Sequence, residues 1–279
     1  MENINISIFF NNLRGLSVYK YLVKKKEYNI DIYLSKKNLN KSLLLKLKDY
    51  KLVDKLDNKF IKNIKKKKYF LHIAAGWPLK FPSELIKSST KGTINLHAGK
   101  LPEYRGGSPL NWQIIEGKKK IFISIIKMTK DYDKGSIYSQ KFFKLKSSEN
   151  IKDLHKKVNN AYPLMTQSVI KDIIKNIKPI KQSKKNARYM KQRSDADGQI
   201  NWETMSANNV FNLVRALDKP YQGAFYINKK KKIRIFKCRK VKFNQNLKSG
   251  EVLYRNRKKV IKCKTDAVEI LKEKKTNYK

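Results

Sequence analysis

An asparagine and a histidine two residues apart, Asn95 and His97, are the first candidates for chemistry in a chain of 279 residues with only three histidines. They open the segment NLHAGKLPEYRGGSPLNW, residues 95–112, which is rich in turn-forming residues. Residues i and i+2 of a strand point to the same side, so the carboxamide and the imidazole can converge on one reacting centre. The amide can donate a hydrogen bond to a developing oxyanion, worth about 3 kcal/mol in a dry site. The imidazole can exchange protons near neutral pH, although a lone Asn-x-His more often marks a histidine held by loop hydrogen bonds.

A carboxylate follows on the next expected strand. The segment MTKDYDKGSI, residues 128–137, places Asp133 two residues before Gly135. An Asp-x-Gly is most often a simple turn, but its position after that strand lets Asp133 reach the same crevice and orient the imidazole. The motif has no serine or cysteine nucleophile, so an amide, an imidazole and a carboxylate favour direct acyl transfer to an amine over a covalent acyl-enzyme. No phosphate-binding glycine loop and no metal-ligand spacing accompany them.

The elements that must position these residues alternate between strands and helices along the first two thirds of the chain. The pattern predicts strands at 4–10, 29–34, 69–75, 94–97, 121–128 and 136–145, and helices at 16–26, 58–68, 81–87, 108–117 and 150–177. This order predicts an α/β fold, a Rossmann-like and mostly parallel sheet with helices on both faces. Ligands bind such sheets at the carboxyl ends of the strands, where Asn95 and His97 are expected.

A second, smaller domain is expected after a polar and basic stretch. One helix at 207–217 and about five short strands predict a small C-terminal β-barrel of the OB type. We therefore predict a catalytic domain at 1–180, a linker at 181–200 and a barrel domain at 201–279.

The net charge of +44 is typical of a nucleic-acid-binding protein, but the residue types argue against that conclusion. Only nine of the 66 basic residues are arginine, which binds phosphate better than lysine does. A chain rich in Lys, Asn and Ile favours a solvated lysine surface, which would still attract anionic substrates.

The apolar runs, the first residues and the cysteines indicate the environment in which the protein works. No apolar run is long enough to span a membrane, and the first residues, MENINISIFF, are typical of a strand and not of a leader, so we expect a cytoplasmic protein. Cys238 and Cys263 have no metal spacing and are expected to be reduced, structural thiols.

The two motif segments together resemble the folate-dependent formyltransferase family. This family includes methionyl-tRNA, sugar-nucleotide and glycinamide ribonucleotide formyltransferases. Its hallmarks are an Asn-x-His, a Leu-Pro-x-Tyr/Trp-Arg-Gly turn and an Asp about 36 residues after the His, which is the spacing from His97 to Asp133. DGQINW at 197–202 and VRALDKPYQGAF at 214–225 extend the resemblance over most of residues 4–270.

The resemblance implies 10-formyltetrahydrofolate as formyl donor and no metal. By position, Asn95 would stabilise the oxyanion, His97 would handle protons, and Asp133 would orient and tune His97. The backbone around 74–79 and 129–133 would line the folate pocket, with these residues as the candidate contacts: Ala75, Gly76, Trp77, Pro78, Leu79, Lys130, Asp131 and Tyr132. Arg105 and Gly106 would shape the active-site turn and contact the substrate, although Arg105 could instead brace the loop.

The acceptor amine is the open question. Methionyl-tRNA members usually carry a long basic loop with Gly or Pro after the second strand, whereas this chain has YLSKKNLNKSLLLKL there. It also has FNNLRG in place of their Gly-Thr-Pro turn. These differences favour a nucleotide-linked amino sugar, formylated on a 4-amino group.

Two alternatives remain open, methionyl-tRNA as acceptor and a catalytically dead module that binds nucleic acid. The partners considered are thus a nucleotide-sugar first and tRNA second, without a membrane. The sequence also leaves a homodimer open.

Overall fold

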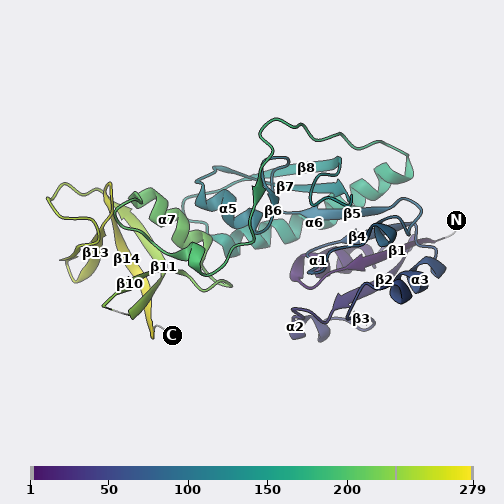
Figure 1. The fold of residues 1–279 in the computed structure, drawn as a ribbon, viewed down its shortest axis with the longest axis horizontal. Helices are drawn as coiled ribbons and strands as arrows, with labels where there is room; N and C mark the ends of the chain where they lie inside the picture. Colours follow the sequence, from purple (N-terminus) through teal and green to yellow (C-terminus); the bar gives the residue numbers. More distant parts are fainter. Residues whose placement is uncertain (1–2, 230, 278–279) are drawn as a thin grey trace. The chain divides into compact units, whose positions relative to one another are not determined.

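The computed structural model describes residues 3–229 and 231–277, and Figure 1 traces them as a ribbon. The elements are β1 (Ile4–Phe9), α1 (Leu13–Leu22), β2 (Tyr28–Ser35), α2 (Lys41–Leu44), β3 (Lys51–Val53), α3 (Asn58–Lys66), β4 (Leu71–Ala74), α4 (Ser83–Ile86), β5 (Thr93–His97), β6 (Arg105–Gly106), α5 (Pro109–Ile115), β7 (Lys120–Lys127), β8 (Ile137–Lys144), α6 (Ile151–Ile174), β9 (Tyr189–Met190), a 3₁₀ turn (Ala196–Gly198), α7 (Ala207–Ala216), β10 (Ala224–Asn228), β11 (Lys231–Val241), β12 (Val252–Arg255), β13 (Lys258–Lys262) and β14 (Ala267–Asn277).

A seven-stranded sheet carries the motif residues, in the strand order β3-β2-β1-β4-β5-β7-β8. The pairs β2–β3, β1–β2, β1–β4 and β4–β5 are parallel, whereas β5 and β7 are antiparallel. The chain therefore leaves β5 and returns along its neighbour β7 in the opposite direction. The end of β7 therefore lies beside the start of β5, where the N–H of Met128 donates to the carbonyl of Thr93. From there the loop after β7 folds back, so that Asp133 reaches Asn95 and His97.

The residues pack into two compact units. The first consists of Met1–Gly106, Phe122–Phe142 and Lys156–Tyr189, and the second of Gly107–Ile121, Phe143–His155 and Met190–Lys279. The boundaries at 180 and 200 expected from the sequence stay a prediction.

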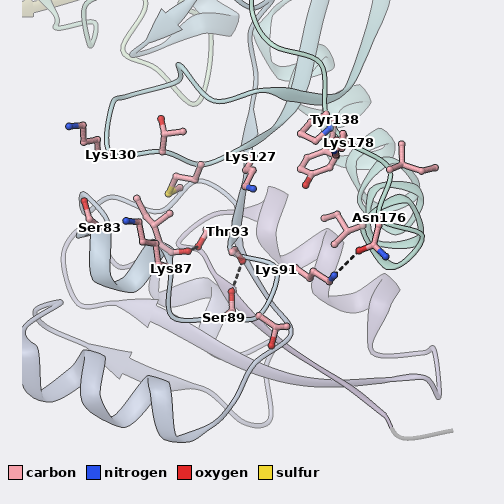
Figure 2. Close-up of a pocket in the computed structure, with 18 residues that line it drawn as sticks. Ser83, Lys87, Ser89, Lys91, Thr93, Lys127, Lys130, Tyr138, Asn176 and Lys178 are labelled. Atoms are coloured by element: carbon pink, nitrogen blue, oxygen red, sulfur yellow. Dashed lines mark hydrogen bonds between the residues drawn. The ribbon is translucent and has the colours of Figure 1, made fainter.

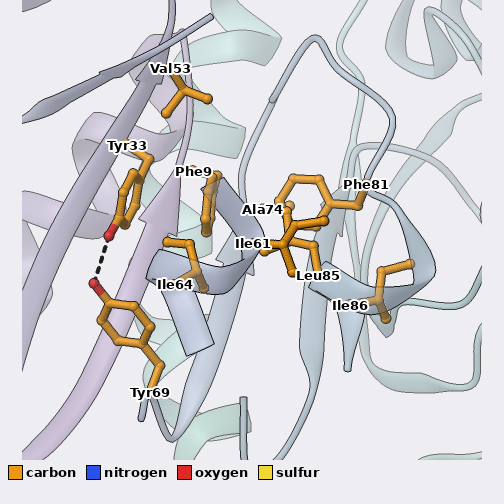
Figure 3. Packing of buried hydrophobic residues seen from close by; sticks show 10 residues of the cluster. All are labelled: Phe9, Tyr33, Val53, Ile61, Ile64, Tyr69, Ala74, Phe81, Leu85 and Ile86. Carbon is orange, nitrogen blue, oxygen red and sulfur yellow. Dashed lines mark hydrogen bonds between the residues drawn. The ribbon is translucent and has the colours of Figure 1, made fainter. Parts of the chain in front are cut away.

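The first unit has an aromatic core on one face of its sheet, shown in Figure 3. Phe9 of β1 stacks on Tyr33 of β2 with ring centroids 4.7 Å apart, and it meets Phe81 edge to face at 5.0 Å. Buried residues of α3 and α4 complete this core: Ile61, Ile64, Leu85 and Ile86. Aromatic pairs of this geometry are favourable and hold the sheet against both helices.

The second unit contains a five-stranded antiparallel sheet in the order β10-β11-β14-β13-β12. Helix α7 packs on β11 and on α5, and Ser206 starts it with a capping box to Asn209. Cys238 and Cys263 are both buried and free in this unit. The predicted fold class, a mostly parallel α/β sheet followed by a small β domain, is confirmed.

No helix in residues 3–229 and 231–277 is long and apolar enough to cross a bilayer.

The core of the first unit also buries a histidine, His72 of β4, which is 0% exposed. Its Nδ1 lies 2.5 Å from the Ser7 hydroxyl, and its Nε2 lies 2.8 Å from Ser88 Oγ. The Ser88 hydroxyl donates to the carbonyl of Leu85, so Nε2 is the ring nitrogen that donates and Nδ1 the one that accepts. Burial favours this neutral ring and lowers the pKa of His72 to about 3.

We expect His72 to make the protein less stable in mild acid. An unfolded histidine takes up a proton below its ordinary pKa of 6.5, whereas folded His72 stays neutral down to about 3. The contribution of His72 to the free energy of unfolding is therefore fully favourable above pH 6.5, and it is lost progressively as the pH falls from there. Urea denaturation should show the free energy of unfolding falling by up to about 2 kcal/mol between about pH 6.5 and about pH 5. His72→Gln, which can still hydrogen-bond both serines, should remove most of this slope, and an unchanged slope would contradict this explanation.

Candidate active site

The structure brings Asn95, His97 and Asp133 together. Asn95 and His97 lie at the carboxyl end of β5, and Asp133 lies in the loop between β7 and β8. The Asn95 amide donates to Asp133 Oδ1 at 3.3 Å, and His97 Nδ1 lies 3.4 Å from the same oxygen. The side chains of His97 and Asp133 are only 6% and 9% exposed, so their charges act in a poorly hydrated place.

The second ring nitrogen of His97 is occupied by the backbone. Nε2 lies 2.5 Å from the carbonyl oxygen of Tyr104. A carbonyl can only accept, so this contact assigns a proton to Nε2. Nδ1, facing Asp133, is then the nitrogen that can gain and lose a proton.

Asp133 is held at its other oxygen as well. The backbone N–H of Gly106 donates to Oδ2 at 2.8 Å. Asp133 itself has a φ of 53°, in the left-handed region, which Asp tolerates better than most residues. Its carboxylate thus accepts from Asn95 of β5 and from Gly106 of β6, and it fixes one strand to the other.

Gln182 clamps the Asp133 loop from outside the motif. Its amide nitrogen donates to the carbonyls of Asp133 and Gly135, both at 2.7 Å. Its oxygen accepts from Arg105 Nε at 3.0 Å and from Nη2 at 2.8 Å. Gln182 was missed by sequence reasoning because it lies in the stretch expected to be a linker, where nothing distinguishes it from other polar residues.

Arg105 is buried, with 8% exposure, although it was expected to contact substrate. Besides Gln182 it meets the Tyr189 ring, with the guanidinium carbon 5.6 Å from the centroid. Its contacts favour the bracing alternative, and a role of Arg105 or Gly106 in substrate binding stays a prediction.

The chain has room only for a glycine at position 135. A Cβ built on it would lie 1.5 Å from the carbonyl oxygen of Lys127, at the end of β7. Only glycine lets the chain pass so closely against that carbonyl, and this passage sets where Asp133 lies.

A cavity of about 110 Å³ opens beside the three residues. Asn95 and Asp133 line it, together with five of the residues expected at the folate pocket, Trp77, Leu79, Lys130, Asp131 and Tyr132. Sequence reasoning missed Phe81, Ile86, Ile126 and Met128, which give the cavity an apolar wall. In the sequence these four residues resemble ordinary core residues, so nothing marks them as part of a pocket.

Ala75, Gly76 and Pro78 were expected at the pocket but are not among its lining residues. Gly76 has a φ of 73°, and a Cβ on it would lie 1.8 Å from the side-chain nitrogen of Asn12. Asn12 caps α1. Gly76 thus serves a tight packing contact with the start of α1, and any folate contact of these three residues stays a prediction.

Among the described residues that line the cavity, only Trp77 has a buried side-chain nitrogen or oxygen without a hydrogen-bond partner. Its indole N–H is buried and has no hydrogen-bond partner among the described residues. The ring meets Phe9 and Phe81 edge to face, at 5.3 and 6.3 Å, which fixes its orientation. A buried donor without a partner is costly, so this N–H is available to a ligand acceptor.

Comparison with known families agrees with this geometry. Residues 17–170 match the model of the formyl transferase family, and residues 193–279 match its C-terminal domain. The chain belongs to the formyl transferase family. The first matched segment includes Asn95, His97 and Asp133.

This formyl transferase is similar in sequence to two curated proteins that carry different names. The bifunctional polymyxin resistance protein ArnA of Wigglesworthia glossinidia brevipalpis is 39% identical over 67% of this chain. The methionyl-tRNA formyltransferase of Caldicellulosiruptor saccharolyticus is 33% identical over 69% of it. The match spans 28% of the length of ArnA and 61% of that of the second relative.

A solved structure shares the fold over nearly the whole formyl transferase chain. WlaRD, a sugar 3N-formyl transferase crystallised in the presence of dTDP and 5-N-formyl-THF, superposes with a TM-score of 0.71. The superposition covers 97% of this chain and 98% of WlaRD, at 16% identity.

We expect Gly135→Ala to destabilise the site locally. The added methyl would meet the Lys127 carbonyl and displace the loop, lowering the free energy of unfolding by about 1–3 kcal/mol. Gly92→Ala is the matched control, because a Cβ there would lie 3.7 Å from its nearest neighbour and only its φ of 80° opposes alanine. Denaturation curves should give Gly135→Ala a clearly lower free energy of unfolding than Gly92→Ala. Equal free energies would contradict the idea that the Lys127 carbonyl leaves no room for a side chain at position 135.

Proposed function

We propose that this chain transfers a formyl group from 10-formyltetrahydrofolate to the primary amine of a nucleotide-linked amino sugar. The observation that carries the proposal is the convergence of Asn95, His97 and Asp133 beside the small cavity. Family membership supports formyl transfer, and the ligand of WlaRD supports a reduced folate as donor.

The lining of the cavity suits the flat end of a folate. Its wall is apolar and aromatic, and Trp77 offers an indole N–H that lacks a partner. A pterin carries ring nitrogens and a carbonyl that accept hydrogen bonds, so it would satisfy this donor. Trp77, Leu79, Phe81 and Met128 would hold the ring, and the bound folate would supply the formyl carbon.

The three polar residues then divide the chemistry of direct transfer. The acceptor nitrogen bonds to the formyl carbon, the bond from that carbon to the folate nitrogen breaks, and one proton passes from the amine to the folate nitrogen. Asn95 uses one amide hydrogen for Asp133, which leaves the other to stabilise negative charge on the formyl oxygen.

His97 would carry the proton. Its Nε2 is fixed on Tyr104, so Nδ1 can take the proton of the incoming amine, with Asp133 stabilising the charged ring. This makes His97 and Asp133 a pair that holds the proton between the two bond changes.

The acceptor assignment rests on the segments outside this motif. Residues 36–50 between β2 and β3 contain the four-residue α2 and five lysines but neither Gly nor Pro. This counts against the Gly- or Pro-containing loop that is expected of tRNA members. Methionyl-tRNA is the second candidate, supported by the relative from Caldicellulosiruptor saccharolyticus and the charge of +44. A catalytically dead nucleic-acid-binding module is the third, and the intact set of three residues counts against it.

We expect His97→Ala and Asp133→Asn each to lower kcat for formyl transfer by at least about 100-fold. Each change removes the proton-holding pair and leaves the apolar wall of the cavity intact, so binding of tetrahydrofolate should change little. Steady-state turnover and calorimetric titration measure the two effects separately. Near-normal turnover in either variant would contradict the assigned roles.

The acceptor is tested by a panel under the same conditions. We expect nucleotide-linked 3-amino or 4-amino sugars to react with a kcat/KM at least about 100-fold above that of methionyl-tRNA. Formylated products should be identified by mass spectrometry, with His97→Ala as the blank. Preference for methionyl-tRNA would replace the sugar proposal by the second candidate.

A further inference from the structure

A second and larger cavity adjoins the first one. Its volume is about 700 Å³, and it lies among α4, the start of β5, the end of β7 and the end of α6 (Figure 2). The two cavities have four lining residues in common: Ile86, Met128, Thr129 and Lys130. Residues 128–130 therefore belong to the walls of both cavities.

The large cavity lies at the end of β5 that is farther from the reacting residues. Thr93, the first residue of β5, lines it, whereas Asn95, His97 and Asp133 do not. A strand rises about 3.3 Å per residue, so His97 lies about 13 Å farther along β5 than Thr93. The small cavity, by contrast, has Asn95 and Asp133 in its lining. A ligand held within the large cavity therefore takes no part in the transfer of the formyl group.

Lysine supplies the charge of the large cavity. Five lysines line it, and its described lining includes neither Asp nor Glu: Lys87, Lys91, Lys127, Lys130 and Lys178. The Lys91 ammonium donates to Asn176 Oδ1 at 2.8 Å, a neutral partner. None of the five lysines forms an ion pair with a carboxylate of the described residues. The cavity thus attracts anions and has no counter-charge of its own in its described lining.

Two hydroxyl groups in the lining are already used within the chain. The buried Thr93 hydroxyl donates to the carbonyl of Ile86 at 3.0 Å, and the Ser89 hydroxyl donates to the carbonyl of Gly92 at 2.5 Å. These bonds fix the turn that leads from α4 into β5. The lysines are therefore the main groups of the lining that remain for an anion.

The two sides of the large cavity differ in chemistry. In Figure 2 Lys87 and Lys130 lie at one side and Lys127 lies near the middle. Tyr138 lies at the other side, together with Lys178. Helix α6 ends shortly before Lys178 in the chain, and the partial negative charge of a helix carboxyl end opposes an anion there. An anionic group is therefore favoured near Lys87, Lys127 and Lys130, and a flat group near the ring of Tyr138.

We propose that the large cavity binds a nucleoside triphosphate, with its phosphates at Lys87, Lys127 and Lys130 and its base against Tyr138. A cavity of about 700 Å³ lies in the range that holds ligands of this kind. Lysine is a common partner of phosphate, and every base has a flat face that stacks on an aromatic ring. Apolar residues of the lining give the base further contacts: Ile173, Ile177 and Pro179.

The lack of carboxylates in the described lining decides which form of the ligand is favoured. Proteins hold Mg²⁺ with carboxylates together with the phosphates of a substrate, and this lining offers only the lysines. Bound Mg²⁺ would also neutralise part of the phosphate charge that the lysines attract. The cavity is therefore expected to favour the metal-free triphosphate.

The test is calorimetry on the whole chain with EDTA present, with ATP and inorganic tripolyphosphate as the two probes. We expect ATP to bind at least about tenfold more tightly than tripolyphosphate, because only ATP has a base to stack on Tyr138. Excess Mg²⁺ should weaken the binding of ATP by at least about threefold. Salt at about 0.5 M should weaken it further, because Lys87, Lys127 and Lys130 are exposed. Equal affinities for the two probes, or tighter binding of ATP with Mg²⁺, would overturn the proposal.

Substitutions separate the contribution of the base from that of the phosphates. Tyr138→Leu should remove the advantage of ATP over tripolyphosphate, whereas Tyr138→Phe, which keeps the ring, should retain it. Lys87→Gln together with Lys127→Gln should weaken both probes by about fivefold. Lys59 and Lys62 are exposed and line neither cavity, so their exchange for Gln should leave both affinities close to those of the wild type. Equal losses in the two double variants would assign the binding to the overall charge and would overturn the proposal.

A competition experiment separates this site from those of the proposed reaction. Tetrahydrofolate and a nucleotide-linked amino sugar, each at saturation, should leave the number of ATP molecules bound per chain unchanged, because the reacting residues lie outside the large cavity. Displacement of ATP by either compound would place ATP in a substrate site and would overturn the proposal. The measurement needs no formyl transfer, so its outcome does not depend on the proposed reaction.

Discussion

The carboxylate of Asp133 is the constraint on which the site depends. One side chain accepts from the Asn95 amide, faces His97 and accepts from the backbone of Gly106, so three segments of the chain meet on two oxygens. Burying a charge is costly unless hydrogen bonds replace the lost water, and charge-assisted bonds of this kind are the strong ones. The contacts of Gly135 with Lys127 and of Gln182 with the loop backbone keep the carboxylate where these bonds form. The position of His97 then follows from Asp133 on one side and the Tyr104 carbonyl on the other.

The two cavities show why net charge is a poor guide to function in this chain. A charge of +44 attracts nucleic acid, nucleotides and folates alike. The small cavity has a largely apolar wall, and the large one has lysines without acidic neighbours in its described lining, although both belong to the same basic molecule. Local arrangement decides which anion is held, because screening removes the influence of charges beyond about 10 Å.

The sheet and the three polar residues could be predicted from the sequence because their signals are local. Strand periodicity locates β5, and the i, i+2 spacing puts Asn95 and His97 on one side of it. The position of Asp133 depends on more than a local pattern, because the end of β7 lies beside the start of β5 and the loop has to fold back to bring this carboxylate to Asn95 and His97. Gln182 and the apolar wall of Phe81 and Met128 act through contacts between distant segments, which no local pattern encodes. Conversely, the sequence predicted Gly76 at the folate pocket, whereas in the structure this glycine packs closely against the side chain of Asn12.

In the proposed reaction Asn95, His97 and Asp133 act on the formyl group whatever amine attacks it, so the choice of acceptor must come from other residues. The start of α1 is one element tied to them. Arg14 donates from Nη1 to the carbonyl of Leu96 at 3.2 Å, between Asn95 and His97, and its guanidinium lies 5.3 Å from the Tyr162 ring centroid. A change in the FNNLRG turn would therefore move a group that touches the catalytic strand itself.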